Sequence, residues 1–209
     1  MHAEAFCWMR AALQYPAPAG VSMPRLPTSQ PLAVTGADTR IGWPSAQPGF
    51  AFDNECPAMG VRLEGFEIDS APVSAGAFAR FVEAGGYDKA PYWPQDAGVW
   101  RAQSPHAHPQ QWRRAPGGDW QVRWFDQWRA LDEQAPAMHI NAFEAQAYCL
   151  WAGRRLPSAS EWGTRRPHAQ RFSLGPQRVG ADIEPLCALP RLCARPIPRL
   201  FTALVWRPP

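Results

Sequence analysis

Two helix-start signatures that follow one another closely constrain the fold of this chain more than any other feature. Asn141 is followed three residues later by Glu144, and Ser158 is followed three residues later by Glu161. In such a capping box, the first side chain accepts a hydrogen bond from the third residue's backbone N–H, and the acidic side chain accepts one in return. The first helix is predicted to end before Gly153, which suits the position after a helix. Two capped helices joined by the segment RRLP are therefore a specific local signal.

Three further elements are predicted upstream from the spacing of apolar residues. A helix is expected over residues 2–14, where apolar side chains recur at intervals of three and four and two prolines follow. Apolar and charged residues alternate over 61–69, which predicts a half-buried strand with a break at Gly65. Ser74 is expected to cap a short helix that stops at Gly85–Gly86.

Two stretches show little periodicity. Residues 15–50 are rich in Pro, Ser, Gly and Thr, and they are interpreted as a linker or surface arm. Residues 87–135 carry six of the eleven tryptophans among Gly, Pro and Gln. This second stretch predicts a long, aromatic-pinned loop region with short strands.

Composition excludes several classes of protein. No run of about 18 apolar residues occurs, so no membrane span is expected. No basic-then-apolar leader opens the chain, so the cytoplasm is the expected location. Residues 1–162 hold 13 Lys+Arg and 16 Asp+Glu, whereas residues 163–209 hold 8 Arg and 2 acids. The body therefore lacks a basic face, and nucleic acid is not an expected partner.

The cysteines indicate neither a disulfide framework nor a zinc site. Their number is odd, their spacing is irregular and no CxxC occurs. Buried free thiols are the expected state of Cys7, Cys56, Cys149, Cys187 and Cys193.

The segment around the two capping boxes reads AFEAQAYCLWAGRRLPSASEW. It resembles the signature of the formylglycine-generating-enzyme-like (FGE-sulfatase) family, and GFAFDNECP, VRLEGFEID and PVSAGAFARFVEAGGY resemble that family's early strand and first helix. FAFDNE, EAGGY and GGDWQVRWFDQW are similar to the branch of ergothioneine sulfoxide synthases and selenoneine synthases. In that branch a DinB-like four-helix bundle with an HxxxH iron motif precedes the domain, and the opening residues MHAEA match the second half of that motif.

This resemblance implies an α+β fold: the mixed FGE-sulfatase-like (C-type-lectin-like) fold with little regular secondary structure, preceded by the last helix of a DinB-like bundle. The expected organisation is a bundle remnant at 1–15, a linker at 16–48, the N-terminal part of the FGE-sulfatase-like domain at 49–162 and an out-of-frame, disordered tail at 163–209.

The resemblance also implies oxidative chemistry. Enzymes of this branch hold a non-haem Fe(II) with three histidines and use O2 to join a sulfur or selenium donor to the imidazole of a histidine-derived betaine. On this resemblance His2 is one iron ligand, and the expected partners are a hercynine-like betaine, a thiol or selenosugar donor and O2. Glu4 lies about 200° further round the helix and is not a co-ligand.

The second histidine of the motif would lie four residues before His2, so the resemblance implies that the chain is truncated at its N-terminus. One imidazole does not hold a catalytic metal, so the chain is expected to bind iron weakly or not at all and to be inactive. The family's catalytic and substrate-binding residues lie in the C-terminal half, and none is assigned here. Two alternatives stay open: an oxidase of the formylglycine-generating kind, which needs a reactive cysteine pair binding copper, and a non-catalytic ligand-binding module of the same fold.

Three other polar motifs are interpreted as structural. His139 precedes a helix cap. His106 and His108 form an H-x-H pair in a Pro-rich loop, but no third ligand is close in sequence. The segment DNE at 53–55 lacks the spacing and glycine of a calcium loop and is expected to cap backbone groups in a turn.

The resemblance stops at Trp162. Pro167 would break the helix that Ser158 begins, and the following sequence is rich in Arg, Pro, Leu and Cys without a period. A one-base insertion near the Trp162 codon is expected, because a shifted frame permits a continuation similar to the family. The alternative is a genuinely divergent, disordered C-terminus. The nucleotide sequence of codon 163 and beyond distinguishes the two.

Overall fold

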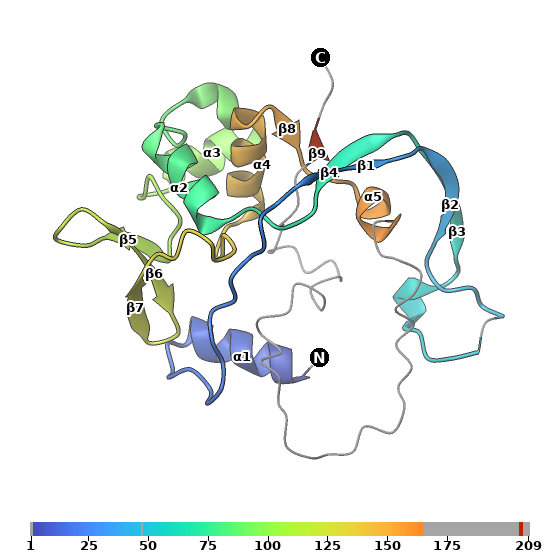
Figure 1. The fold of residues 1–209 in the computed structure, drawn as a ribbon, viewed down its shortest axis with the longest axis horizontal. Helices are drawn as coiled ribbons and strands as arrows, with labels where there is room; N and C mark the ends of the chain where they lie inside the picture. Colours follow the sequence, from blue (N-terminus) through green and yellow to red (C-terminus); the bar gives the residue numbers. More distant parts are fainter. Residues whose placement is uncertain (1, 47, 165–204, 207–209) are drawn as a thin grey trace.

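The computed structural model describes residues 2–46, 48–164 and 205–206 of the 209-residue chain, and it mixes short helices with short strands (Figure 1). The α+β class expected from the sequence is therefore observed. In chain order the elements are α1 (His2–Ala12), β1 (Pro31–Val34), β2 (Ala37–Ile41), η1 (Asp53–Glu55), β3 (Met59–Leu63), β4 (Phe66–Asp69), α2 (Ala75–Glu83), η2 (Ala90–Tyr92), α3 (Asp96–Gln103), β5 (Trp112–Arg114), β6 (Trp120–Trp124), β7 (Gln127–Ala130), α4 (Ala142–Trp151), β8 (Arg154–Arg155), α5 (Ala159–Thr164) and β9 (Val205–Trp206).

The main hydrophobic core lies between α2 and α4. Ser74 caps α2 as predicted, since its side chain accepts a hydrogen bond from the backbone N–H of Ala77. Phe78 and Phe81 point from α2 to the Tyr148 ring on α4, at centroid distances of 5.4 and 5.8 Å. Aromatic contacts of this kind add to the free energy gained from area burial. They give a small domain a rigid centre on which the polar clusters described below are built.

A long ribbon of paired strands lies on the opposite side of the molecule (Figure 1), and its β1–β4 part belongs to a four-stranded sheet. β1 pairs with β4, and β2 pairs with β3, both antiparallel. The predicted break at Gly65 is confirmed, because β3 ends at Leu63 and β4 begins at Phe66. Gly36 faces this break, and a Cβ at Gly36 would lie 2.9 Å from the Gly65 backbone nitrogen. The two glycines let the strands approach closely where the ribbon bends.

The linker predicted at 16–48 is corrected by this ribbon, since both β1 and β2 fall inside it. Residues before β1 are also tied to the domain: Leu26 donates its backbone N–H to the Gln134 carbonyl at 2.7 Å, and Arg25 pairs with Asp132 at 2.9 Å. Proline and glycine in this stretch conceal the strands, whose pairing comes from residues far along the chain. The domain therefore begins well before residue 49.

The tryptophan-rich region is more ordered than its sequence indicates. Strands β5, β6 and β7 form an antiparallel meander, as the expectation of short strands implies. Helix α3 is a departure from the expected loop. It has no side-chain cap, and it contains Gly98, where a Cβ would lie 2.8 Å from the Trp93 carbonyl oxygen. A helix without a cap, and with a glycine required by close packing, carries no local signal that predicts it.

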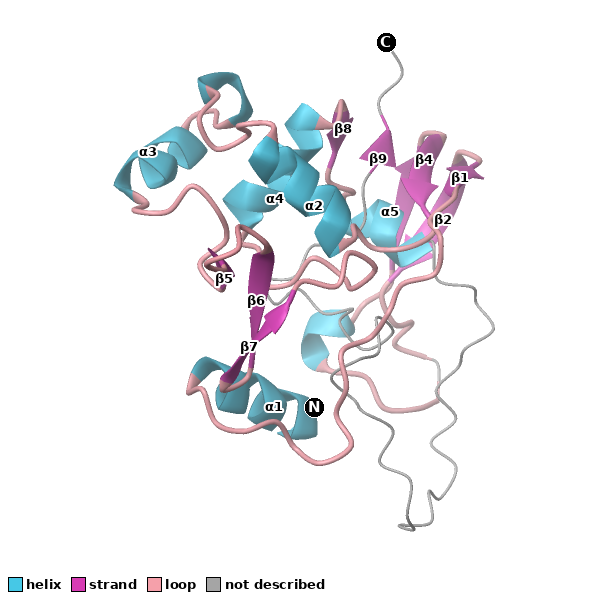
Figure 2. Cartoon of the chain, turned by 60° about the vertical axis from the view of Figure 1, so that its left-hand side comes forward, coloured by secondary structure: helices cyan, strands magenta, loops and turns pink. Residues whose placement is uncertain are grey.

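Helix α1 confirms the helix predicted over 2–14, and it lies beside the β6–β7 end of the meander in both views (Figures 1 and 2). The side chains of Cys7, Arg10 and Ala11 are half-buried, whereas Phe6 and Leu13 are 58% and 62% exposed. The helix thus exposes several of its large apolar residues, and the half-buried Arg10 donates to the Pro16 carbonyl just beyond the helix at 2.8 Å.

Most of the predicted tail lies outside the described residues. Two of its residues, Val205–Trp206, form β9 between β4 and β8 in a four-stranded sheet with β1. At this position the expectation of a tail without structure is wrong, and a β-branched residue followed by an aromatic one suits a strand. Within the described part of the chain, no helix is both long and apolar enough to span a membrane.

Candidate functional site

The first polar cluster joins the two halves of the aromatic core. Glu144 is 3% exposed, and one of its carboxylate oxygens accepts a hydrogen bond from the Tyr87 hydroxyl at 2.6 Å. The other oxygen accepts from the backbone N–H of Asn141 at 2.8 Å, which completes the predicted capping box. Burial raises the pKa of Glu144 above 4.5 and outweighs both hydrogen bonds.

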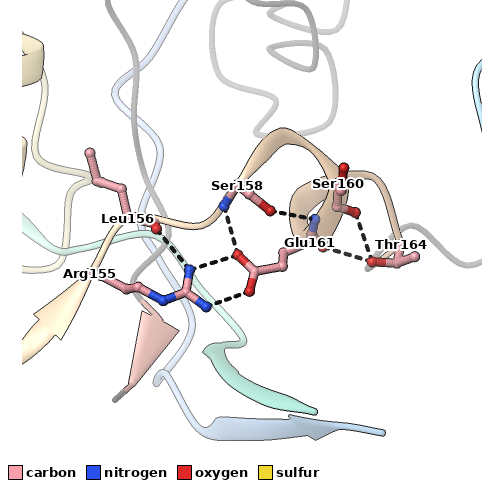
Figure 3. Close-up of polar contacts among 6 residues, drawn as sticks. All are labelled: Arg155, Leu156, Ser158, Ser160, Glu161 and Thr164. Atoms are coloured by element: carbon pink, nitrogen blue, oxygen red, sulfur yellow. Dashed lines mark hydrogen bonds and ion pairs between the residues drawn. The ribbon is translucent and has the colours of Figure 1, made fainter. Parts of the chain in front are cut away.

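The second polar cluster lies at the start of α5 (Figure 3). The Arg155 guanidinium donates to both carboxylate oxygens of Glu161, at 2.7 and 2.5 Å. Glu161 also accepts from the Ser158 backbone N–H, and the Ser158 hydroxyl accepts from the Glu161 backbone N–H. The hydrogen bonds from Arg155 are the main reason that the pKa of Glu161 falls to about 2. Both arrangements fix helix starts, and neither leaves a group directed at a reacting molecule.

The thiols do not form a redox or metal centre in the described part. Cys149 is 1% exposed on α4, and burial raises the pKa of its thiol to about 12. A thiol with this pKa is protonated at neutral pH and is a poor nucleophile or metal ligand. Cys7 and Cys56 are free thiols, but the expectation that they are buried is wrong, since Cys7 is half-buried and Cys56 is exposed. Cys187 and Cys193 lie outside the described residues.

His2, the predicted iron ligand, is the first residue of α1. The His106–His108 pair is more than 100 positions from His2 in the sequence. The two rings of this pair stack, with 5.4 Å between their centroids and an interplanar angle of 24°. The lone pair of a ring nitrogen lies in the plane of its ring. Because the two ring planes are stacked one above the other, their lone pairs do not point at one ion. His139 forms a hydrogen bond with the backbone of Arg123, in line with its predicted structural role.

These donors do not fit a complete Fe(II) site. Among the side chains that the structure describes, which do not include that of His2, no group of three or more His, Cys, Asp or Glu is placed to hold a metal ion. A non-haem Fe(II) centre with open positions needs about three protein ligands. The described side chains do not provide such a set, and the ligand role of His2 stays a prediction.

The predicted turn at 53–55 is confirmed as η1. Glu55 accepts a hydrogen bond from the Phe52 backbone N–H at 3.0 Å, which is the capping role expected of this segment.

Two long-range contacts were missed from the sequence. Tyr87 and Glu144 are 57 positions apart, and Gln14 and Arg123 are 109 positions apart. The only local signal was the capping box itself, which identifies Glu144 as a helix-start residue but says nothing of the hydroxyl group that it meets.

Comparison with known proteins agrees with this fold. The family model of the sulfatase-modifying factor enzyme 1-like domain matches residues 21–176. The match begins before β1 and extends beyond Trp162 to residue 176.

Several characterised relatives are similar to this chain. Hercynine oxygenase of Mycobacterium tuberculosis is 34% identical over 122 residues, which cover 58% of this chain and 28% of the relative. Hercynine oxygenase of Mycolicibacterium smegmatis is 33% identical over 129 residues, 62% of this chain and 29% of the relative. A formylglycine-generating enzyme of Thermomonospora curvata is 34% identical over 143 residues, 63% of this chain and 46% of the relative.

The chain thus spans less than a third of the hercynine oxygenases and less than half of the formylglycine-generating enzyme that it matches. Because the family model covers most of the chain, the chain belongs to the sulfatase-modifying factor enzyme 1-like (FGE-sulfatase) family.

Proposed function

We propose that this chain is part of a non-haem Fe(II), O2-dependent oxidoreductase that forms a C–S or C–Se bond on the imidazole of a histidine-derived betaine. The observation that carries this proposal is the similarity to hercynine oxygenases of three mycobacterial species at 33–34% identity. In the proposal, His2 is one Fe(II) ligand, since imidazole suits this ion. The position of α1 as the last helix of a DinB-like bundle and a cytoplasmic location remain predictions.

The residues of the described domain supply the scaffold in this proposal. The β6–β7 end of the meander lies beside α1 (Figures 1 and 2), and support by ordered elements is what a metal site requires. The 209-residue chain by itself is proposed to be inactive, because one imidazole does not hold a catalytic metal. The donor, sulfur or selenium, is left open.

The test is conversion of hercynine. The purified chain is loaded with Fe(II) under anaerobic conditions and mixed with hercynine, a thiol or a selenosugar, and O2, and products are measured by mass spectrometry. No product is expected from the chain alone. A longer protein, with helices that supply two more histidines and the frame restored after Trp162, is expected to give product. His2→Ala in that protein should abolish turnover, whereas His106→Ala, the loop control, should not.

Product formation that survives His2→Ala would contradict the proposed ligand role. Failure of the longer protein to convert hercynine with any donor would contradict the proposed substrate. A nucleotide sequence in which codon 163 opens no family-like frame would contradict the predicted insertion.

A second candidate is a formylglycine-generating oxidase, which is favoured by the similarity to the Thermomonospora curvata enzyme. This chemistry needs a reactive cysteine pair, and the high pKa of the Cys149 thiol argues against its use. Titration with Cu(I) distinguishes the two candidates: tight Cu(I) binding lost in Cys187→Ser or Cys193→Ser would favour the oxidase.

A further inference from the structure

Helix α1 ends in an unusual backbone conformation. Gln14 has a φ of 59°, the left-handed region, where helix ends place glycine far more often than a residue with a long side chain. The Tyr15 backbone N–H donates to the Arg10 carbonyl at 2.9 Å, so the helix closes around this residue. A residue other than glycine is uncommon at such a φ, which motivates a hypothesis that its side chain has a structural role.

The Gln14 side chain reaches the meander. Its Oε1 atom accepts a hydrogen bond from the Arg123 guanidinium of β6 at 3.1 Å. Gln14 is exposed, so this contact is local to the junction of α1 and the meander and is not part of the core.

Arg123 is itself held firmly. Its guanidinium carbon lies 4.6 Å from the centroid of the Trp128 ring, which is its cross-strand partner on β7. Arg113 contacts the same ring at 4.2 Å and donates to the Gln121 side chain at 2.8 Å. The Arg123 backbone N–H donates a hydrogen bond to the Gln111 carbonyl at 2.9 Å, and the Arg123 backbone also forms a hydrogen bond with the His139 side chain. An arginine restrained at both its backbone and its side chain is a fixed point for whatever it binds.

The length of α1 between His2 and Gln14 means that a small tilt at one end displaces the other end. His2 and Gln14 are separated by about 18 Å along the helix axis at the standard rise per residue. A tilt of about 10° at the Gln14 end would move the His2 end by about 3 Å, whereas metal–ligand distances tolerate about 0.2 Å. The end of α1 that contacts the meander therefore controls where the other end lies.

We propose that Arg123 is a positioning residue: through Gln14 it holds α1, and with it His2, against the β5–β6–β7 meander. The importance for iron rests on the proposed function, in which His2 is a ligand. The positioning itself rests only on the contacts just described.

The test is hydrogen exchange of the α1 amides in the full chain. Arg123→Ala and Gln14→Ala are each expected to speed exchange of these amides about 2- to 10-fold, the range for one lost hydrogen bond, with the α2 and α4 amides unchanged. Because both variants break the same contact, the double variant should exchange no faster than either single one. Gln14→Glu should keep exchange of the α1 amides as slow as in the unmodified chain, since a carboxylate accepts a hydrogen bond from Arg123 more strongly than an amide does.

Arg129→Ala is the matched control. Arg129 lies on β7 of the same meander, and its side chain bonds only to Gln127 among the described contacts. Unchanged α1 exchange in Arg123→Ala, or equal acceleration in Arg129→Ala, would overturn the positioning role, as would additive effects in the double variant.

A separate titration keeps this inference distinct from the proposed function. Fe(II) affinity that is the same in His2→Ala and in the unmodified chain would contradict the proposed ligand role of His2. The exchange data would still decide whether Arg123 holds the helix.

Discussion

The two capping boxes have the same sequence pattern and opposite electrostatics. Glu144 and Glu161 are both buried, at 3% and 8% exposure, and each closes a box with the residue three positions before it. Yet the pKa of Glu144 is raised by burial, whereas that of Glu161 is lowered to about 2, chiefly by hydrogen bonds from Arg155. The capping motif fixes the helix start. The residue that contacts the carboxyl group from outside the box, here called the third partner, decides whether that group favours its charged form: it is Tyr87 for Glu144 and Arg155 for Glu161.

The identity of that third partner follows from where it lies in the chain. Arg155 is six residues before Glu161, within the connection between the two helices. Tyr87 comes from a loop 57 residues away and brings a neutral hydroxyl group into the aromatic core. A buried carboxyl group with a cation beside it keeps its charge, and one with only neutral donors pays for desolvation.

Truncation of the buried box should have the largest effect. Glu144→Ala leaves the Tyr87 hydroxyl and the Asn141 backbone N–H without their acceptor and opens a small cavity, so a loss of about 3 kcal/mol in the free energy of unfolding is expected. Urea denaturation measures it. Glu64→Ala is the control, because the Glu64 side chain is 93% exposed, and it should change stability by less than about 0.5 kcal/mol. Equal effects of the two variants would contradict the structural role of Glu144.

Acid should weaken the second box next. Because the folded pKa of Glu161 is about 2 and its ordinary value is 4.5, its contribution is present above pH 4.5 and is lost as the pH falls toward 2. The loss is about 2 kcal/mol once the partial exposure of Arg155 is allowed for. Stability measured between pH 5 and 2 should fall less steeply in Glu161→Gln. An identical slope in both proteins would show that the ion pair contributes nothing.

Removing the hydroxyl group of the first box should cost less. Tyr87→Phe deletes one hydrogen bond to Glu144, worth about 1 kcal/mol, and removes one of the two bonds that restrain the raised pKa. The pKa of Glu144, measured by carboxyl-carbon NMR, should therefore rise further. A fall of that pKa in Tyr87→Phe would mean that burial is not the dominant cause.

The smallest effect is expected from a neutral isostere. Since the folded pKa of Glu144 is raised, its contribution is complete below about pH 4.5 and is lost as the pH rises through the folded value. Glu144→Gln should remove this dependence and change stability near neutral pH by less than about 1 kcal/mol. A large loss in Glu144→Gln at neutral pH would show that the charged form is the one the fold requires.

The sequence predicts those parts of the fold whose causes are local. The two boxes, the Ser74 cap, the helix over 2–14 and the break at Gly65 each depend on residues a few positions apart, and all are observed. The family similarity depends on the same segments, and the family model confirms it.

The parts that were missed depend on distant residues. Strands β1 and β2 are defined by pairing with β4 and β3, which lie further along the chain, and their own Pro-rich stretch predicts only a linker. Helix α3 depends on close packing at Gly98, and the Gln14–Arg123 contact depends on the placement of α1. For the site, only a motif match identifies His2 as an iron ligand, and its role as a ligand stays a prediction.

Anaerobic titration with Fe(II) tests the central claim most directly. The chain should bind Fe(II) weakly and well below one ion per chain at micromolar concentrations, and His2→Ala should remove that binding. Tight, stoichiometric binding of ferrous ion by the 209-residue chain, unaffected by His2→Ala, would contradict it.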